Sequence, residues 1–362
     1  MSAMTRRVVV GTAVVSLAFA MAACGKTGGD KDNNSGGKGK VIGLLLPDTV
    51  TARYEQFDRP LIEKKIKELC ADCTVDYANA AGQPQTQAQQ ISSMITRGVK
   101  VLILDPQDSA GVKSSVQSAV DKGIKVVSYD RLAQGPVSAY VSYDNEKVGE
   151  LQGQALLDAM GPAATPQAKI VMINGDDADP NAAQFKAGAH KVLDGKVDIA
   201  YEQSGLWKDN IATQKVNAAI TQIGAKNIKG VYSANDTMAG GIATALRGAG
   251  LHVPLTGQDA ELAGIQRILT GAQTATVFKD YQPEADATAE LAINLLNGKS
   301  IASLTDTTVA SGSGQKVPSK LLTAASITKA NVKDIVTKYH LYTAAQICTG
   351  EFAQPCKDAG IQ

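Results

Sequence analysis

Short apolar runs that alternate with helix-like stretches make up most of the chain from residue 41 onward. The first run, Val41–Leu46, is continuously apolar and is ended by Pro47. Such a run suits a strand that is covered on both faces, as in a parallel sheet. The expected strands span residues 41–46, 74–77, 99–104, 124–129, 169–173, 197–201, 230–232, 253–256 and 274–278, with helices at 54–69, 85–97 and 109–122. This repetition predicts an α/β fold with doubly wound parallel sheets.

Two stretches of the chain follow the same plan. In one, Asp105 begins a helix that leads into a strand and ends at Asp130. In the other, Asn235 begins a helix that leads through a strand to Asp259 at nearly the same spacing. We therefore expect two similar lobes. Ligands of doubly wound sheets bind outside the carboxyl ends of the strands, so Asp130 and Asp259 are expected to point into the cleft between the lobes.

Length and charge agree with two lobes and exclude one class of partner. The chain has 362 residues, which is too long for one typical core. Its 36 Lys and Arg residues nearly balance 35 Asp and Glu residues, and no basic run occurs. A near-neutral chain of this kind argues against nucleic acid as a partner.

The first 40 residues have the pattern of an export signal followed by a tether. Arg6 and Arg7 precede an apolar run over residues 8–23, which is short for a membrane span. Small residues then lead to Cys24, in a pattern that resembles a lipoprotein box. We expect residues 1–23 to be a signal peptide, Cys24 to carry the lipid, and the polar residues 24–40 to be a flexible tether. The alternative is plain secretion, with Cys24 unmodified.

The other four cysteines suggest disulfides. Cys70 and Cys73 can form a redox pair, but they end a helix, whereas redox motifs lie at a helix start. Cys348 and Cys356 flank a polar turn. In an exported protein we favour a structural 70–73 disulfide and a 348–356 disulfide, although four cysteines allow three connectivities.

Polar residues follow several of the expected strands. Asp105, Asp144 and Asp236 can be ordinary helix caps. Arg131 and Lys279 fit that explanation less well, because long cations have no capping role at a helix N-terminus. A sugar presents hydroxyls that donate and accept, and it needs carboxylates, cations and amides around it, with an aromatic ring on its C–H face. The set therefore indicates a sugar site.

Several motifs together resemble the xylose-binding proteins of bacterial ABC transporters, in the type I periplasmic binding protein family. They are Tyr129-Asp130-Arg131, residues 142–152 (SYDNEKVGELQ), 234–241 (ANDTMAGG) and 257–265 (GQDAELAGI), then Val317-Pro318-Ser319 followed by Leu321-Leu322-Thr323. The likeness runs from about residue 41 to residue 340. It implies a sugar site between two lobes joined by a three-strand hinge.

The resemblance also implies boundaries and contacts. The first lobe is expected to hold residues 41–142 and 281–305, including a helix at 284–297, and the second 143–280 and 306–346; residues 347–362 are an extension. The implied sugar contacts are Arg53, Asp130, Arg131, Asn181, Asn235, Asp259 and Lys279. Asp144 and Asn145 match the motif at the first crossing between lobes, and Trp207 or Tyr54 is the implied stacking partner.

The chain is expected to act as a monomeric receptor that passes a monosaccharide to a membrane permease. The expected monosaccharide is xylose. The receptor needs no cofactor or metal: the Asp-x-Asp-x-Asn run at residues 177–181 lacks the glycine and glutamate of a calcium loop, and three histidines form no zinc motif. The alternatives are a carbohydrate hydrolase, a sugar-sensing repressor core, and a receptor for another pentose or glucose. The sequence shows no carboxylate pair assignable as acid and nucleophile, which disfavours a hydrolase.

Overall fold

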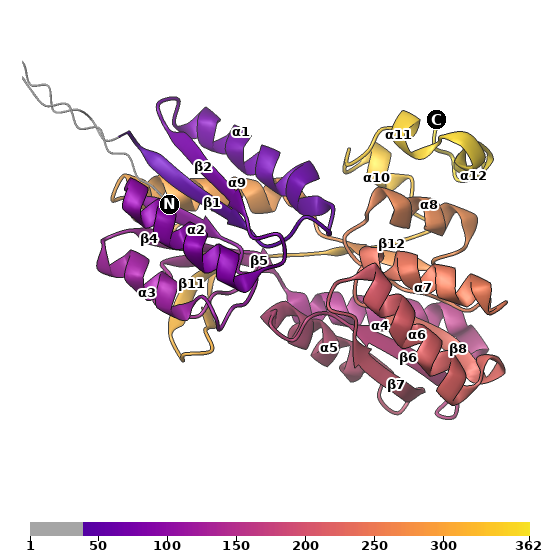
Figure 1. The fold of residues 1–362 in the computed structure, drawn as a ribbon. Coiled ribbons are helices and arrows are strands. Elements are labelled where there is room, and N and C mark those ends of the chain that lie inside the picture. Colours follow the sequence, from indigo (N-terminus) through magenta and orange to yellow (C-terminus); the bar gives the residue numbers. More distant parts are fainter. Residues whose placement is uncertain (1–38) are drawn as a thin grey trace, which may run out of the picture. The chain divides into compact units, whose positions relative to one another are not determined.

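The computed structural model describes residues 39–362, which form two α/β lobes (Figure 1). The predicted signal peptide, the lipidation site Cys24 and the tether up to residue 38 lie outside the described residues. Over residues 39–362, no helix combines the length and apolar character that a membrane span needs.

The first lobe is built on a seven-stranded sheet in the order β10-β11-β5-β4-β3-β1-β2. Its strands are β1 (Val41–Leu46), β2 (Thr74–Asn79), β3 (Val101–Leu104), β4 (Lys125–Tyr129), β5 (Ala139–Tyr143), β10 (Thr307–Ala310) and β11 (Lys316–Leu322). Its helices are α1 (Arg59–Leu69), α2 (Pro84–Arg97), α3 (Lys113–Asp121) and α9 (Tyr281–Leu296), and a short π-helical turn η1 (Tyr54–Asp58) precedes α1. All neighbouring strands are parallel except β10 and β11.

The apolar run of β1 is buried on both faces of this sheet, as its sequence predicts. Leu44 packs with Ile62 of α1 in one core cluster, whereas Leu45 packs with Ile91 of α2 in another. Helices α1 and α9 therefore cover one face and α2 and α3 the other. This is the doubly wound arrangement.

The second lobe has a three-stranded parallel sheet in the order β7-β6-β8. Its elements are β6 (Lys169–Asn174), β7 (Asp198–Ser204), β8 (Ile228–Ser233), β9 (Ala275–Phe278), β12 (Ala325–Thr328), α4 (Asn145–Met160), α5 (Pro180–Leu193), α6 (Asp209–Ile223), α7 (Asp236–Gly248) and α8 (Leu262–Thr270). Single parallel bridges, Val231 with Leu255 and Gln258 with Val277, extend the sheet from β8 to the antiparallel pair β9-β12. The expected strand at 253–256 is thus reduced to one bridge.

The chain crosses between the lobes three times: from β5 to α4, from β9 to α9, and from β11 to β12. The expected boundary at residue 306 is wrong, because β10 and β11 belong to the first sheet. Strand β11 pairs with β5 and buries Val317 in the first lobe, so the last crossing follows Leu322.

The C-terminal segment packs against the second lobe. Its helices are α10 (Asp334–Thr337), α11 (Ala344–Ile347) and α12 (Ala353–Asp358). Ile347 and Cys356 join Ile265 of α8 in one buried cluster. The structure pairs Cys70 with Cys73 and Cys348 with Cys356, which is the pairing favoured from the sequence. The Cys348–Cys356 disulfide links the end of α11 to α12 within this segment.

Candidate functional site

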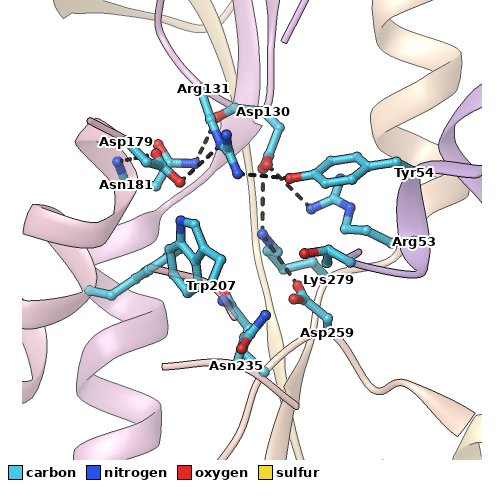
Figure 2. A pocket seen from close by; sticks show the side chains of 13 residues that line it. Arg53, Tyr54, Asp130, Arg131, Asp179, Asn181, Trp207, Asn235, Asp259 and Lys279 are labelled. Carbon is cyan, nitrogen blue, oxygen red and sulfur yellow. Dashed lines mark hydrogen bonds and ion pairs between the residues drawn. The ribbon is translucent and has the colours of Figure 1, made fainter. Parts of the chain in front are cut away.

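A pocket lies at the carboxyl ends of the strands and is lined from both lobes (Figure 2). Its lining residues are Thr51, Arg53, Tyr54, Asp130, Arg131, Asp179, Asn181, Phe185, Trp207, Asn235, Gln258, Asp259 and Lys279. The empty space among these side chains, which is open to solvent, is about 280 Å³.

Nine of the eleven residues expected to contact a sugar lie together in this pocket. They are Arg53, Tyr54, Asp130, Arg131, Asn181, Trp207, Asn235, Asp259 and Lys279. They come from segments that follow different strands, either loops or the first residues of helices, which the parallel sheets bring to one edge of each lobe. Residues far apart in the sequence thus converge because of the topology.

The other two expected contacts, Asp144 and Asn145, lie outside the pocket. Asp144 is exposed and caps α4, where its Oδ1 accepts a hydrogen bond from the backbone N–H of Lys147 at 3.0 Å. Asn145 donates from Nδ2 to Oγ of Ser142 at 3.3 Å. Both residues therefore stabilise the crossing from β5 to α4, and they leave the set of proposed ligand contacts.

Asp130 is held in an unusual backbone conformation at the end of β4. Its φ is +54°, a left-handed value that residues other than glycine seldom adopt. The carbonyl oxygen of Asp130 accepts hydrogen bonds from Tyr140 Oη at 3.0 Å, Ser142 Oγ at 2.7 Å and Asn181 Nδ2 at 3.0 Å. Three donors thus fix this peptide, and the carboxylate is aimed into the pocket. Strained conformations fixed in this way cluster at functional sites.

Asp259 in the second lobe mirrors Asp130. Its φ is +90°, its carbonyl accepts a hydrogen bond from the Tyr281 hydroxyl, and its N–H donates to the Val277 carbonyl at 2.8 Å. Lys279 lies between the two carboxylates. Its Nζ is 3.4 Å from Oδ1 of Asp130 and 3.7 Å from Oδ1 of Asp259 (Figure 2). One cation on a crossing therefore contacts a carboxylate from each lobe.

The charges around Asp130 keep it ionised. Burial alone disfavours its charged form, but Arg53, Lys279 and Arg131 outweigh burial and hold the pKa of Asp130 at about 2. Asp130 is therefore an acceptor of hydrogen bonds at any physiological pH.

Arg131 is oriented by contacts with both lobes. Its Nε is 2.9 Å from Oδ2 of Asp179, and its Nη2 donates to the Tyr54 hydroxyl at 3.0 Å. Nη1 donates to the Pro106 carbonyl at 3.3 Å. Asp179 belongs to the second lobe, so the Arg131–Asp179 pair joins the two lobes above the pocket.

Trp207 forms part of the second-lobe wall. Its ring is nearly buried and stands edge-on to Phe185, with 6.3 Å between ring centroids. A Cβ added to Gly175 would lie only 2.0 Å from this ring, so glycine is required there for the ring to fit. The indole thus lies fixed against the backbone and can present an apolar surface to a ligand.

Besides Arg131 Nε, which lies 2.9 Å from Asp179 as an ion pair, four buried polar atoms of the pocket have no hydrogen-bond partner among the described residues. They are Asn181 Oδ1, Trp207 Nε1, Gln258 Oε1 and Asp259 Oδ1. Buried polar groups are normally paired, and an unpaired group costs about 1–3 kcal/mol. Three acceptors and one donor that converge on one pocket fit a ligand rich in hydroxyl groups.

The sequence matches the model of the periplasmic binding protein domain over residues 42–300. This chain belongs to the periplasmic binding protein family. It is 39% identical to the D-xylose-binding periplasmic protein of Escherichia coli over 82% of this chain and 89% of that protein. The corresponding protein of Haemophilus influenzae is 34% identical, over 84% of this chain and 91% of that one.

A solved structure supports the same assignment. The carbohydrate transporter solute binding protein from Chloroflexus aurantiacus, in complex with D-glucose, superposes with a TM-score of 0.76 and 26% identity. The match covers 84% of this chain and 97% of that one. The chain is therefore a type I periplasmic binding protein of the ABC sugar transporter class.

Four pocket residues of this periplasmic binding protein escaped the sequence analysis: Thr51, Asp179, Phe185 and Gln258. Asp179 lay in the rejected calcium motif, although Asp179-Pro180 is also a helix-start signal. Phe185 lies four positions after Asn181 on α5, so helical spacing places both on one face. Gln258 lies next to Asp259 in the motif at residues 257–265.

The described residues offer no clear metal site. Over residues 39–362, the one group of side chains close enough to hold an ion is Cys70, Asp72 and Cys73, and its two cysteines are joined in a disulfide. A disulfide has no thiolate to offer a metal.

Proposed function

We propose that this periplasmic binding protein captures one monosaccharide, D-xylose, in the cleft and delivers it unchanged to the permease of an ABC transporter. The observation that carries the proposal is the convergence of four unpaired polar atoms with Asp130, Arg131 and Lys279 in a small pocket. The two relatives named above are xylose-binding proteins, which supports xylose as the sugar.

Capture is proposed to occur by closure of the two lobes. Residues 39–143 with 281–322 would move against residues 144–280 with 323–362. Asp130 and Asn181 lie on opposite lobes, as do Arg53 and Asp259. A sugar that contacts both sides favours the closed form, because a ligand shifts an equilibrium only by its differential affinity for the two states.

Catalysis is not part of the proposal. A glycosidase needs one carboxyl group that donates a proton and a second that attacks or activates water. Asp130 stays ionised and so cannot donate the proton, and each of its carboxylate oxygens faces a cation at 3.4 Å, Lys279 at Oδ1 and Arg53 at Oδ2. Asp179 uses both oxygens, one for the Asn181 N–H at 2.8 Å and one for Arg131 at 2.9 Å. Of the carboxylates that line the pocket, only Asp259 remains, and a single carboxylate does not make the pair.

Calorimetric titration of the purified protein with D-xylose, L-arabinose, D-ribose and D-glucose tests the proposal. We expect the tightest binding with D-xylose, and chromatography of the released ligand should return unchanged xylose. Absence of binding by every monosaccharide would refute a sugar receptor. Formation of a product would favour the hydrolase. Tighter binding of glucose would instead favour the second candidate, which the D-glucose complex of the Chloroflexus protein supports.

Sugar binding should change the fluorescence of Trp207, the one tryptophan in the sequence. Its ring lines the pocket and is nearly buried, so a ligand alters its surroundings directly or through closure. The measurement is a titration with D-xylose monitored by emission intensity and wavelength. A calorimetric binding signal without any change in emission would place the bound sugar away from Trp207.

We also propose that the protein is exported, lipid-anchored at Cys24 and monomeric, so that the tether lets the receptor reach its permease. Membership of a periplasmic family supports export. Cys24→Ser should abolish lipidation and move the protein from the detergent phase to the aqueous phase in phase partitioning. A Cys24→Ser protein that partitions like the wild type would contradict the anchor.

A further inference from the structure

Arg53 is a buried guanidinium that contacts three carboxyl groups in the first lobe. Its Nε donates to Oδ2 of Asp58 at 2.8 Å, and its Nη2 donates to Oε2 of Glu284 at 3.0 Å. Its Nη1 is 3.4 Å from Oδ2 of Asp130. Arg53 is only 2% exposed, and both Asp58 and Glu284 are fully buried.

These contacts leave one end of Arg53 for a ligand. Asp58 also accepts from Nη2 of Arg53, at 3.2 Å, so Nε and Nη2 are held by Asp58 and Glu284 on the side away from the pocket. Neither of these carboxyl groups lines the pocket, whereas Asp130 does. A guanidinium is planar, so fixing Nε and Nη2 also fixes the direction of Nη1.

The three carboxyl groups are not equally satisfied. Asp58 accepts from Arg53 on both oxygens and from the Tyr129 hydroxyl at 2.6 Å. Asp130 has Lys279 as a second cation. Glu284 has a single contact through Oε2, and its Oε1 has no hydrogen-bond partner among the described residues. Because these buried carboxyl groups outnumber the cations beside them, one carboxyl group is expected to bind a proton and become neutral. Glu284 has the fewest contacts that stabilise a negative charge, so it is the expected neutral group.

The charges around Glu284 agree with this assignment. Burial raises the pKa of Glu284 to about 8, since the attraction of Arg53 and Lys279 is opposed by Asp130 and Asp58. The neighbours that face it come from three elements and three adjoining loop positions. They are Asp58 in η1, Tyr129 in β4, Tyr140 and Tyr143 in β5, Arg53 before η1, Asp130 after β4, and Lys279 before α9.

We propose that Glu284 is a positioning residue for the sugar: as a neutral carboxyl group it accepts from Nη2 of Arg53 and thereby directs Nη1 toward the ligand. Glu284 lies in the first turn of α9, directly after a crossing between the lobes. The Arg53 contact therefore also ties the start of α9 to η1. This inference rests on the proposed function, that the pocket binds a monosaccharide.

Two substitutions separate positioning from charge. Glu284→Leu removes the acceptor, so the affinity for D-xylose should fall about tenfold, as expected for the loss of one hydrogen bond to a charged group. Glu284→Gln resembles the neutral carboxyl group and should restore most of that affinity. Glu290→Gln, on the same helix but half-exposed, is the matched control and should bind as the wild type does.

A melting series without sugar tests the proton independently. The pKa of Glu284 is raised from its ordinary 4.5, so folding binds an extra proton between about pH 4.5 and 8. The stability that this proton contributes is fully present below pH 4.5 and is lost as the pH rises through 8. The melting temperature of the wild type should therefore fall more between pH 5 and 8 than that of Glu284→Gln.

The outcomes distinguish the two claims. A wild type that binds no monosaccharide would refute the proposed function and the positioning role with it. Wild-type binding together with unchanged affinity in Glu284→Leu would refute the positioning role alone. Equal pH slopes of melting in the wild type and Glu284→Gln would show that Glu284 is charged, which overturns the neutral-acceptor assignment. If Glu284→Leu does not fold, Glu284→Gln alone tests the inference. A tenfold loss of affinity for D-xylose in this variant would overturn the neutral-acceptor assignment.

Discussion

Asp259→Asn should weaken the binding of D-xylose about a hundredfold. The carboxylate is nearly buried, and its Oδ1 lacks a hydrogen-bond partner among residues 39–362. A hydrogen bond to a charged group contributes about 1.5–3 kcal/mol, which is roughly 10- to 150-fold in affinity. Asparagine is chosen because it tolerates the left-handed backbone at φ +90°, which alanine does not. Calorimetric titration gives the affinity.

The matched control for this substitution is Asp144→Asn. Asp144 was expected in the site from its sequence motif, but the structure makes it the cap of α4, a role that asparagine also fills. Affinity and melting temperature should both stay close to those of the wild type. If Asp144→Asn lost affinity while Asp259→Asn kept it, the assignment of the two residues would be reversed.

Lys279→Met should abolish most of the sugar binding, with a loss of a hundredfold or more. The ammonium group contacts Asp130 and Asp259, and its removal leaves two carboxylates facing each other across the cleft. Removing one partner of a buried ion pair destabilises a protein by about 3–5 kcal/mol. We therefore expect both a lower affinity in calorimetry and a lower melting temperature. Lys329→Met, at an exposed lysine after β12, is the control and should change neither.

The melting temperature of Lys279→Met at acidic pH provides a second test. The pKa of Asp130 is held at about 2, below its ordinary 3.8, so its contribution to stability is present above pH 3.8 and is lost as the pH falls toward 2. Without Lys279 the pKa of Asp130 should rise, and this contribution should shrink. The melting temperature of Lys279→Met should then fall less steeply between pH 4 and 2. An unchanged slope would show that Lys279 does not hold Asp130 in its charged form.

The secondary structure followed from local patterns of the sequence. The run Val41–Leu46 became a strand buried on both faces, and residues 54–69 became η1 and α1. The end of β4 at Asp130 also followed, because a buried run that stops at charged residues marks where a strand leaves the core. Asp130, Arg131, Asn235, Asp259 and Lys279 were anticipated in the pocket for the same reason, and the resemblance to the family added Arg53, Tyr54, Asn181 and Trp207.

Pairing between distant segments did not follow from local patterns. The segment 307–322 has no signal that assigns it to one lobe, and only its pairing with β5 placed β11 in the first sheet. Asp144 and Asp179 show the same limit. Both begin helices after a crossing or a strand, and only tertiary structure turned Asp179 toward Arg131 while leaving Asp144 in solvent.

The sequence by itself thus determined which segments are strands and helices, and that charged side chains stand at the strand ends. Only the tertiary structure decided which of these side chains meet. Lys279 reaches a carboxylate from each lobe, and Glu284 reaches Arg53 across 231 positions of sequence. The physical reason is that local propensity depends on near neighbours, whereas charge balance and burial depend on every group that folding brings within a few ångströms.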